Sequence, residues 1–458
     1  MQFHGINFFA RICVNDHFYN LAALLRESFL EGYLLKRGFY TIMAAQFFSS
    51  LADNALLVVA IALLIELHAP AYLTPMLKFV FVLFYVILAP FVGAFADSMA
   101  KGRVMFISNA IKIVGCSLLF LASHQYFALT AYAVVGLGAA AYSPAKYGIL
   151  TELLPPEKLV IANGWIEGLT VASIVLGTVL GGLLITPAVS SVFLAFDFPF
   201  IDTGVDTTPE ACILLIAAFY GTAAIFNLYI PNTGVDHRIL KKNPIFLIHE
   251  FSHCMKLLWS DKLGQISLAV TTLFWGAGAT LQFIVLKWAD AALGYPLNKA
   301  AQLQGVVAIG IAIGAVFAAR FVSLRQSVKV IPLGIAMGIV VVAMIFVRDL
   351  WISIILLMLI GGLAGFFVVP MNALLQHRGH ILMGAGHSIA VQNFNENLSI
   401  LTMLAVYAIL VSFDVHVYTV IILFGLFVAV TMALIRQWHL RNQSIEDSLH
   451  LIGAHKGH

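Results

Sequence analysis

Charged residues are scarce in this sequence of 458 residues. Aspartate, glutamate, lysine and arginine make up 10% of it, whereas 61% of the residues are hydrophobic. A soluble globular protein carries about a quarter charged residues, because its apolar core needs a polar shell. The chain has too few charges for such a shell, so we expect its surface to face lipid. The formal net charge of +3 is small, and nucleic acid is not an expected partner.

Cysteine motifs and catalytic motifs are missing as well. The four cysteines are scattered, with no Cys-x-x-Cys pair and no His/Cys spacing that suits zinc, so no disulfide framework, metal site or cofactor is predicted. An integral membrane acyltransferase commonly needs a His with an Asp five residues later, and no His here has that neighbour. No Gly-x-Ser-x-Gly elbow is present either. An enzyme is therefore disfavoured, no catalytic residue is assigned, and no soluble signalling domain indicates a receptor.

The N-terminal segment, residues 1–38, does not resemble a secretory signal. Ionisable residues recur through it, so it lacks the uninterrupted apolar core that a signal peptide needs. Residues 21–30 are amphipathic. Two interpretations stay open: a short helix on the membrane surface, or an extension with no specific role.

Long apolar runs occupy most of the remaining chain. A membrane-spanning helix needs about 20 mostly apolar residues, and helices are favoured because each satisfies its own backbone hydrogen bonds in lipid. The sequence therefore predicts an all-α integral membrane protein with about twelve spans. These lie at residues 39–66, 75–96, 104–122, 126–149, 163–186, 210–230, 265–289, 301–322, 329–347, 350–375, 388–412 and 416–438.

Lysine and arginine concentrate in alternate connections between the spans. The loop at 187–209, in the other set, has three aspartates and no basic residue. Basic loops tend to stay in the cytosol, so we expect a multi-pass protein with both termini cytosolic. The basic segment 231–263 is the longest connection on that side. It is either a linker near anionic headgroups or an ordinary solvated linker.

The two halves of the chain look related. Gly136 to Lys146 can be aligned with Gly362 to Asn372, each a run of small residues with a proline two places before a polar group. Such a parallel repeat is typical of transporters whose site lies between two six-helix halves. Pairs of glycines four apart, such as Gly177 and Gly181, indicate close helix packing. The predicted organisation is an extension (1–38), a bundle (39–230), a linker (231–263), a second bundle (264–440) and a cytosolic tail (441–458).

Ionisable residues inside the predicted spans need a partner or water, because a charge in hydrocarbon costs several kcal/mol. Buried ion pairs between helices would explain any one of them. Together they favour a polar cavity for a solute that bears a phosphate or an amine, since ammonium groups bind phosphate and carboxylates bind amines. A proton-relay role for the carboxylates also stays open. The candidate cavity residues are Asp53, Asn54, Asn109, Lys112, Lys146, Glu167, Gln282, Asn372, Asn393 and Glu396.

The loop after the second predicted span carries a recognisable motif. It runs from Gly93 through Asp97 and Lys101 to Gly102-Arg103. This resembles the signature loop of the major facilitator superfamily, Gly-x-x-x-Asp followed by Gly-Arg, although here Gly-Arg lies two residues farther from the aspartate. The resemblance implies a loop that helps to lock one side of a transporter shut, with Asp97 and Arg103 contributing charge and helix-end contacts.

Several longer blocks narrow the resemblance to the bacterial lysophospholipid transporter family, from about residue 39 to 440. They are Ala96–Val104, Ala139–Leu150, Leu273–Gly278, Gly365–Gln376 and Ala390–Asn393 with Glu396-Asn397. The resemblance implies a flippase for lysophosphatidylethanolamine and lysophosphatidylglycerol in the bacterial inner membrane. It also implies reacylation of the product in the cytosolic leaflet by a partner acyltransferase/acyl-carrier-protein synthetase, and no need for an ion gradient.

Residue roles follow from the same resemblance. Asp53 and Lys146 match charged positions that act in substrate handling and gating. Relatives have an Arg at the position of Gln282, which would pair with the aspartate of the first span. Here either Lys287 replaces it or the outer gate is weaker. The main alternative function is a proton-coupled exporter of amphipathic compounds within the same superfamily.

Overall fold

The structure is a computed structural model that describes residues 37–70, 73–186, 207–235, 243–295, 297–445 and 452. The amphipathic segment at 21–30 lies outside these residues, as does most of the loop at 187–209. Within the described part of the chain, every element of regular structure is a helix. This confirms the predicted fold class.

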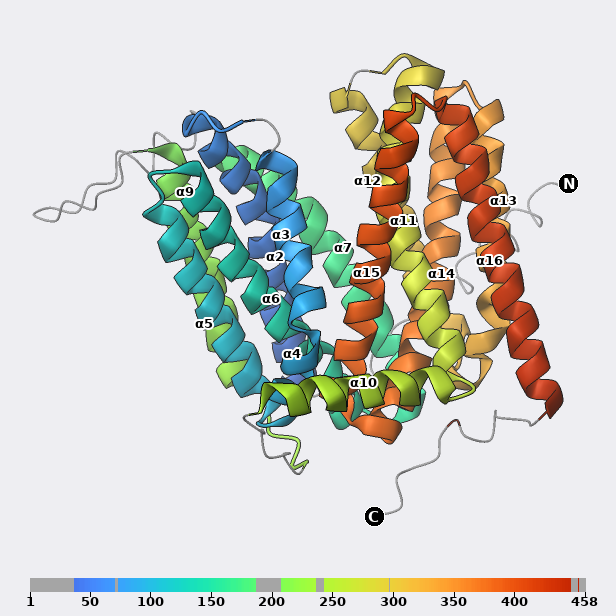
Figure 1. The fold of residues 1–458 in the computed structure, drawn as a ribbon, viewed down its shortest axis with the longest axis horizontal. Coiled ribbons are helices and arrows are strands. Elements are labelled where there is room, and N and C mark those ends of the chain that lie inside the picture. Colours follow the sequence, from blue (N-terminus) through green and yellow to red (C-terminus); the bar gives the residue numbers. More distant parts are fainter. Residues whose placement is uncertain are drawn as a thin grey trace, which may run out of the picture.

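The helices form two groups (Figure 1). The first contains α2 (Arg37–Glu66), α3 (Leu73–Ile87), α4 (Ala89–Asp97), α5 (Lys101–Phe120), α6 (Gln125–Leu153), η1 (Pro156–Lys158), α7 (Leu159–Leu184) and α9 (Thr208–Leu228). The second contains α11 (Gly264–Leu293), α12 (Leu297–Phe321), η2 (Leu324–Val330), α13 (Ile331–Ala343), η3 (Met344–Phe346), α14 (Leu350–Met383), α15 (Ala385–Ser412) and α16 (Val417–Ile445). One further helix, α10 (Pro244–Ser260), joins them.

The number of membrane spans agrees with the sequence. Among the described residues, 11 helices are long and apolar enough to cross a membrane. The pair α3 and α4, bent by 63°, makes up to 12 if it counts as one span. Pro90 stands in the first turn of α4, where a proline is tolerated because the amide it lacks would have no helical partner. The prediction of about twelve spans is confirmed.

The prolines that suggested a repeat occupy matching places in the fold. Pro144 lies inside α6 and Pro370 inside α14, which are the fourth spans of the two halves. Glu167 lies on α7 and Glu396 on α15, the fifth spans. The two halves thus place similar residues on equivalent helices, as the parallel repeat predicted.

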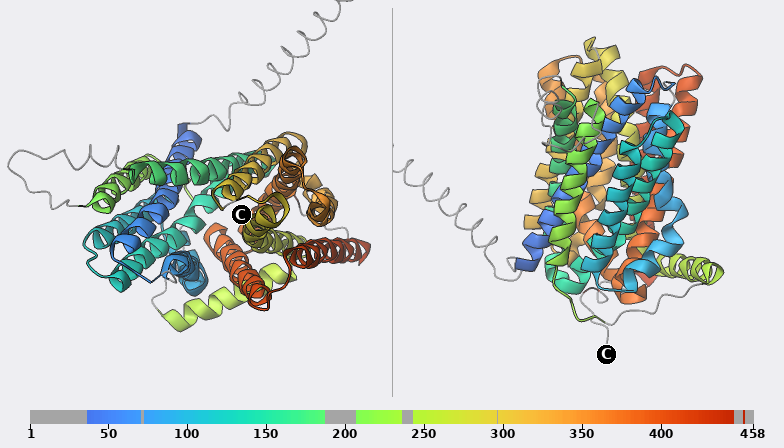
Figure 2. Two further views of the ribbon diagram at one scale, coloured as in Figure 1. Left: turned by 90° about the horizontal axis from the view of Figure 1, so that it is seen from above. Right: turned by 90° about the vertical axis from the view of Figure 1, so that its left-hand side faces the viewer.

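Helix α10 is a feature that the sequence did not reveal. The predicted linker 231–263 contains this helix, which lies across the ends of the spans along one margin of the bundle (Figures 1 and 2). Leu247, Phe251, Cys254 and Leu258 form its buried face. This face packs with α4 of the first half and with α11, α14 and α15 of the second. We call this side of the molecule the α10 end.

The two halves make their mutual contacts mainly near the α10 end. There α4 and α6 pack on α15, while α7 packs on α12 and α14. Along α15, the first residues are largely buried, and those from Leu398 onward are exposed or half-buried. The ribbons in Figure 1 accordingly lie closest near α10 and spread apart toward the opposite end.

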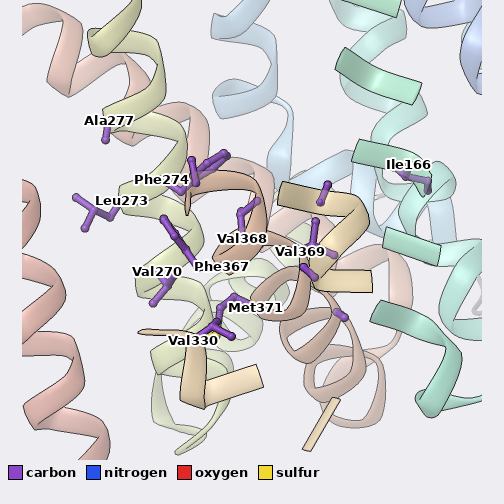
Figure 3. Close-up of a cluster of buried hydrophobic side chains, with 14 of the residues drawn as sticks. Ile166, Val270, Leu273, Phe274, Ala277, Val330, Phe367, Val368, Val369 and Met371 are labelled. Atoms are coloured by element: carbon purple, nitrogen blue, oxygen red, sulfur yellow. The ribbon is translucent and has the colours of Figure 1, made fainter. Parts of the chain in front are cut away.

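An apolar cluster stabilises this contact region (Figure 3). Phe274 of α11 and Phe367 of α14 meet edge to face, with ring centroids 5.8 Å apart. Ile166 of α7 and Val369 of α14 are fully buried in the same cluster. The first half therefore contributes a helix to the core of the second.

Two adjacent glycines on α7 allow the packing of that helix to be tested. A Cβ on Gly181 would lie 2.8 Å from the carbonyl oxygen of Ala55 on α2, whereas a Cβ on Gly182 would have no neighbour within 4 Å. We predict that Gly181→Ala destabilises the protein by about 1–3 kcal/mol, because α2 and α7 must separate. Gly182→Ala should not. Melting temperatures of the two purified variants in detergent measure the difference, and equal values would show that this contact does not limit packing.

Candidate functional site

An ion pair joins two helices inside the first half. The ammonium of Lys112 on α5 lies 2.8 and 2.9 Å from the two carboxylate oxygens of Asp53 on α2. The hydroxyl of Tyr220 on α9 donates to the same carboxylate at 2.7 Å. Asn54, next to the aspartate, donates to the backbone of its own helix at Ser50 instead. Three helices are thus held together by one carboxylate.

The lysine of this pair is enclosed more completely than the aspartate. The Lys112 side chain is 1% exposed and that of Asp53 is 21% exposed. Ser49 accepts a hydrogen bond from Lys112 at 3.0 Å and donates to Asn109 at 2.8 Å. The rings of Tyr142 and Tyr220 also face the ammonium, at 5.1 and 5.2 Å. The ammonium is therefore satisfied internally, and only the carboxylate retains an accessible edge.

A second polar network crosses between the halves. Asn372 on α14 donates to Glu167 on α7 at 3.3 Å, and Tyr147 on α6 lies at 3.5 Å from the same carboxylate oxygen. Gln392 on α15 donates to Asn372 at 3.0 Å and to Glu396 at 2.7 Å. The glutamates of the two fifth spans are thereby connected through two amides. Both are buried, and the amides supply the hydrogen bonds that a buried carboxyl group needs.

Lys146 on α6 differs from Lys112 in having no such partner. Within the part of the chain that the structure describes, its ammonium makes no hydrogen bond and no ion pair, and it lies over the ring of Tyr147 at 4.1 Å. Glu167, Lys112, Asp53 and Glu396 are near enough to interact with it electrostatically. The side chain is only half-buried. An ammonium in this position can receive an anionic group such as a phosphate.

Asp97 joins the halves at the α10 end. Its carboxylate accepts hydrogen bonds from the backbone amides of Gly386 at 2.7 Å and His387 at 3.1 Å, in the first turn of α15. The Nδ1 atom of the His387 ring lies 2.6 Å from it as well. A carboxylate at a helix N-terminus satisfies unpaired amides and interacts favourably with the helix dipole. Asp97, at the end of α4, therefore caps a helix of the other half.

The basic residues of the same loop have different roles. Lys101 lies 2.7 Å from Asp97 and 3.3 Å from Glu152, so it holds two carboxylates of the first half together. Arg103 is exposed and contacts no acidic group among the described residues. Lys101, rather than Arg103, therefore makes the charge contacts of this loop. A Cβ on Gly93 would lie 2.9 Å from that of Ala390 on α15, so this glycine permits α4 and α15 to approach closely.

Other contacts between the halves were not identified from the sequence. Asn163 on α7 and Gln376 on α14 exchange two hydrogen bonds, of 2.9 and 2.8 Å. Both lie at the margins of their predicted spans, where polar residues are ordinary. Asn393 donates to Ser143 on α6 at 2.9 Å, and this amide was among the predicted residues. These bonds all lie in the portions of the helices nearer to α10.

Gln282 lies apart from the Asp53 pair. It is exposed on α11, and its backbone carbonyl accepts a hydrogen bond from Gln304 at 3.1 Å. Over the described ranges, neither Gln282 nor Lys287 forms an ion pair or hydrogen bond with Asp53, whose partners are Lys112 and Tyr220. In the same ranges, no group of three His, Cys, Asp or Glu side chains is arranged to hold a metal ion.

Comparison with known proteins shows which family the chain belongs to. The family model described as Major Facilitator Superfamily matches residues 42–398. The chain belongs to this superfamily. It also belongs to a narrower group, the lysophospholipid transporters named LplT. The chain is 42% identical to "Lysophospholipid transporter LplT" of Serratia proteamaculans over 379 residues, which is 82% of this chain and 89% of the relative. With the protein of that name from Photorhabdus laumondii, identity is 39% over 407 residues, 89% of this chain and 96% of the relative.

Solved structures of transporters share the architecture at low sequence identity. The transporter FucP in the outward conformation matches with a TM-score of 0.65 and 13% identity, covering 88% of this chain and 97% of FucP. A bacterial homologue of the iron transporter ferroportin in an outward-facing state gives 0.64 and 14%, covering 88% and 99%. These likenesses concern the fold alone. Membership of the superfamily identifies the chain as a transporter rather than an enzyme.

The Asp53–Lys112 pair generates a stability prediction. We expect Asp53→Asn to destabilise the protein by about 3–5 kcal/mol, because it leaves the buried ammonium of Lys112 without a counter-charge. The double variant Asp53→Asn/Lys112→Met should recover much of this loss. A double-mutant cycle of melting temperatures in detergent measures the coupling. Additive effects of the two substitutions would contradict a structural role for the pair.

The contact of Asp97 with α15 generates a second prediction. Asp97→Asn should weaken the closure of the α10 end, because an amide caps α15 without a charge and no longer pairs with Lys101. A cysteine introduced as Ala385→Cys, at the buried start of α15, should then react faster with a membrane-permeant maleimide when the native cysteines are replaced. Arg103→Gln, in the same loop but without a contact, is the matched control. Equal labelling rates in both variants would argue against a role of Asp97 in holding the α10 end closed.

Proposed function

We propose that this chain moves lysophosphatidylethanolamine and lysophosphatidylglycerol across the bacterial inner membrane to the cytosolic leaflet. The observation that carries the proposal is its identity of 42% and 39% to two curated lysophospholipid transporters over most of both chains. The proposed mechanism is alternating access, in which the two halves separate first at one end and then at the other.

The site chemistry suits the headgroup of such a lipid. Lys146 supplies an ammonium with no competing hydrogen-bond partner among the described residues, so the phosphate binds there. The accessible edge of Asp53 and the carboxylate of Glu167 provide negative charge for a primary amine. Phosphatidylglycerol headgroups lack that amine and rely on Lys146 alone.

The orientation that we propose places the α10 end in the cytosol. Basic residues gather there, and the cytosolic side of a membrane protein carries an excess of them. Those on described segments are Lys101, Arg103, Lys158, Lys256, Lys262, Arg325, Lys329 and Arg378. The end where the halves spread apart then faces the periplasm. In this orientation, the contact of Asp97 with α15 must break before the lipid reaches the cytosolic leaflet.

The product of this transport is a lysophospholipid that needs a second acyl chain. Following the family resemblance, we propose that a partner acyltransferase/acyl-carrier-protein synthetase supplies it. An alternative function, a proton-coupled exporter of amphipathic compounds, is favoured by one observation. Glu167 and Glu396 are buried carboxyl groups linked through amides, and such groups relay protons in pumps.

Uptake by cells tests the proposal. Cells that express the chain should accumulate labelled lysophosphatidylethanolamine, and an uncoupler should leave the rate unchanged. Lys146→Gln should reduce uptake about tenfold or more, since the phosphate loses its charge-assisted bond. Lys256→Gln, an exposed lysine on α10, is the control and should transport normally. Collapse of uptake with the proton gradient would favour the exporter, and full activity of Lys146→Gln would remove this residue from the site.

A further inference from the structure

A pocket of about 390 Å³ lies far from α10, between the ends of α11 and α15. It is separate from the polar networks described above and shares no residue with them. Its size is at the lower end of ligand pockets, which suits a headgroup rather than a whole lipid. Its lining consists of Phe283, Leu286, Lys287, Asp290, Tyr295, Tyr407 and Val411.

Two opposite charges face this pocket without neutralising each other. Lys287 and Asp290 stand three residues apart on α11, a spacing that permits an ion pair. No such pair forms, and neither charged group has a hydrogen bond or ion pair within the described ranges. Both residues are exposed. The pocket therefore offers one ammonium and one carboxylate that are both available to a ligand.

The remaining walls are aromatic and aliphatic. The rings of Phe283 on α11 and Tyr407 on α15 lie 5.9 Å apart at an angle of 32°. Leu286 and Val411 complete an apolar surface beside the charges. Aromatic faces attract organic cations, and apolar walls accept the glycerol and the first methylenes of an acyl chain. A ligand with two charges and a short apolar part would match all three features.

We infer that this pocket recognises the zwitterionic headgroup of a lysophospholipid, with the phosphate on Lys287 and the primary amine on Asp290. The inference rests on the proposed function and deepens it. Lys287 can bind the phosphate of any lysophospholipid, whereas Asp290 can bind only a headgroup that carries an amine. The pocket thus favours lysophosphatidylethanolamine over lysophosphatidylglycerol. In the proposed orientation it lies on the periplasmic side, where a lipid from the outer leaflet would meet it first.

Charge-removing variants of the full chain test this site. Asp290→Asn should lower the ratio of lysophosphatidylethanolamine to lysophosphatidylglycerol uptake about fivefold or more and leave lysophosphatidylglycerol uptake unchanged. Lys287→Gln should reduce both. Asp414→Asn is the matched control, because this exposed aspartate follows α15 at the same end but does not line the pocket. Its left-handed backbone (φ 52°) also accepts asparagine.

Binding of the two lipids to the purified protein, measured by native mass spectrometry, separates this inference from the proposed function. Selective loss of lysophosphatidylethanolamine binding in Asp290→Asn supports the pocket, even where cells show no uptake and the proposed function fails. Normal uptake with an unchanged lipid ratio in both variants overturns the pocket and leaves the function standing. Absence of binding to the wild-type protein overturns the pocket as well.

Discussion

The carboxylate of Asp97 supports the arrangement of the two halves. It ends α4, caps the first turn of α15 through two backbone amides, and holds Lys101, which in turn reaches Glu152. Its two amide hydrogen bonds form only while α15 stays against α4, whereas its ion pair with Lys101 lies within the first half. The reciprocal amide pair of Asn163 and Gln376 and the close approach at Gly93 reinforce the same closed end. The spreading of the helices at the opposite end is the counterpart of this closure.

Lys112 and Lys146, two lysines of the first half, differ in how completely their surroundings satisfy their charge. Lys112 is enclosed by Asp53, Ser49 and two tyrosine rings, so it has no capacity left for a ligand. Among the described residues, Lys146, from a neighbouring helix, has only the face of Tyr147 as a contact for its ammonium. Both lie in predicted spans, and residue type alone did not separate them, although the family resemblance implied a role for Lys146 only. Partners, rather than position in a predicted span, distinguish these two ammonium groups.

The sequence was informative where composition alone decides structure. The spans follow from apolar length, and so does the single segment 75–96, which the structure breaks where Pro90 stands in the first turn of α4. Contacts with backbone atoms could not be predicted. Asp97 binds backbone amides of α15, and these are present whatever the residue type. Helix α10 was overlooked because 17 residues with four buried positions resemble an ordinary linker. Likewise, the separation of Gln282 from Asp53 depends on how the halves are placed, which no local pattern records.

The apolar contact between α10 and α4 is a surface that water would reach if the closed end opened. Its Phe251 and Cys254 share an apolar cluster with Ala89 and Val92 of α4, while a short link ties α10 to α11. In the proposed alternating access, α10 would stay with the second half, and its apolar contact with α4 would be exposed to water when the halves part at this end. Newly hydrated apolar surface carries a positive heat-capacity change. Hydration of the α10–α4 contact therefore adds a temperature-dependent contribution to the balance between the two open states of the proposed transport cycle.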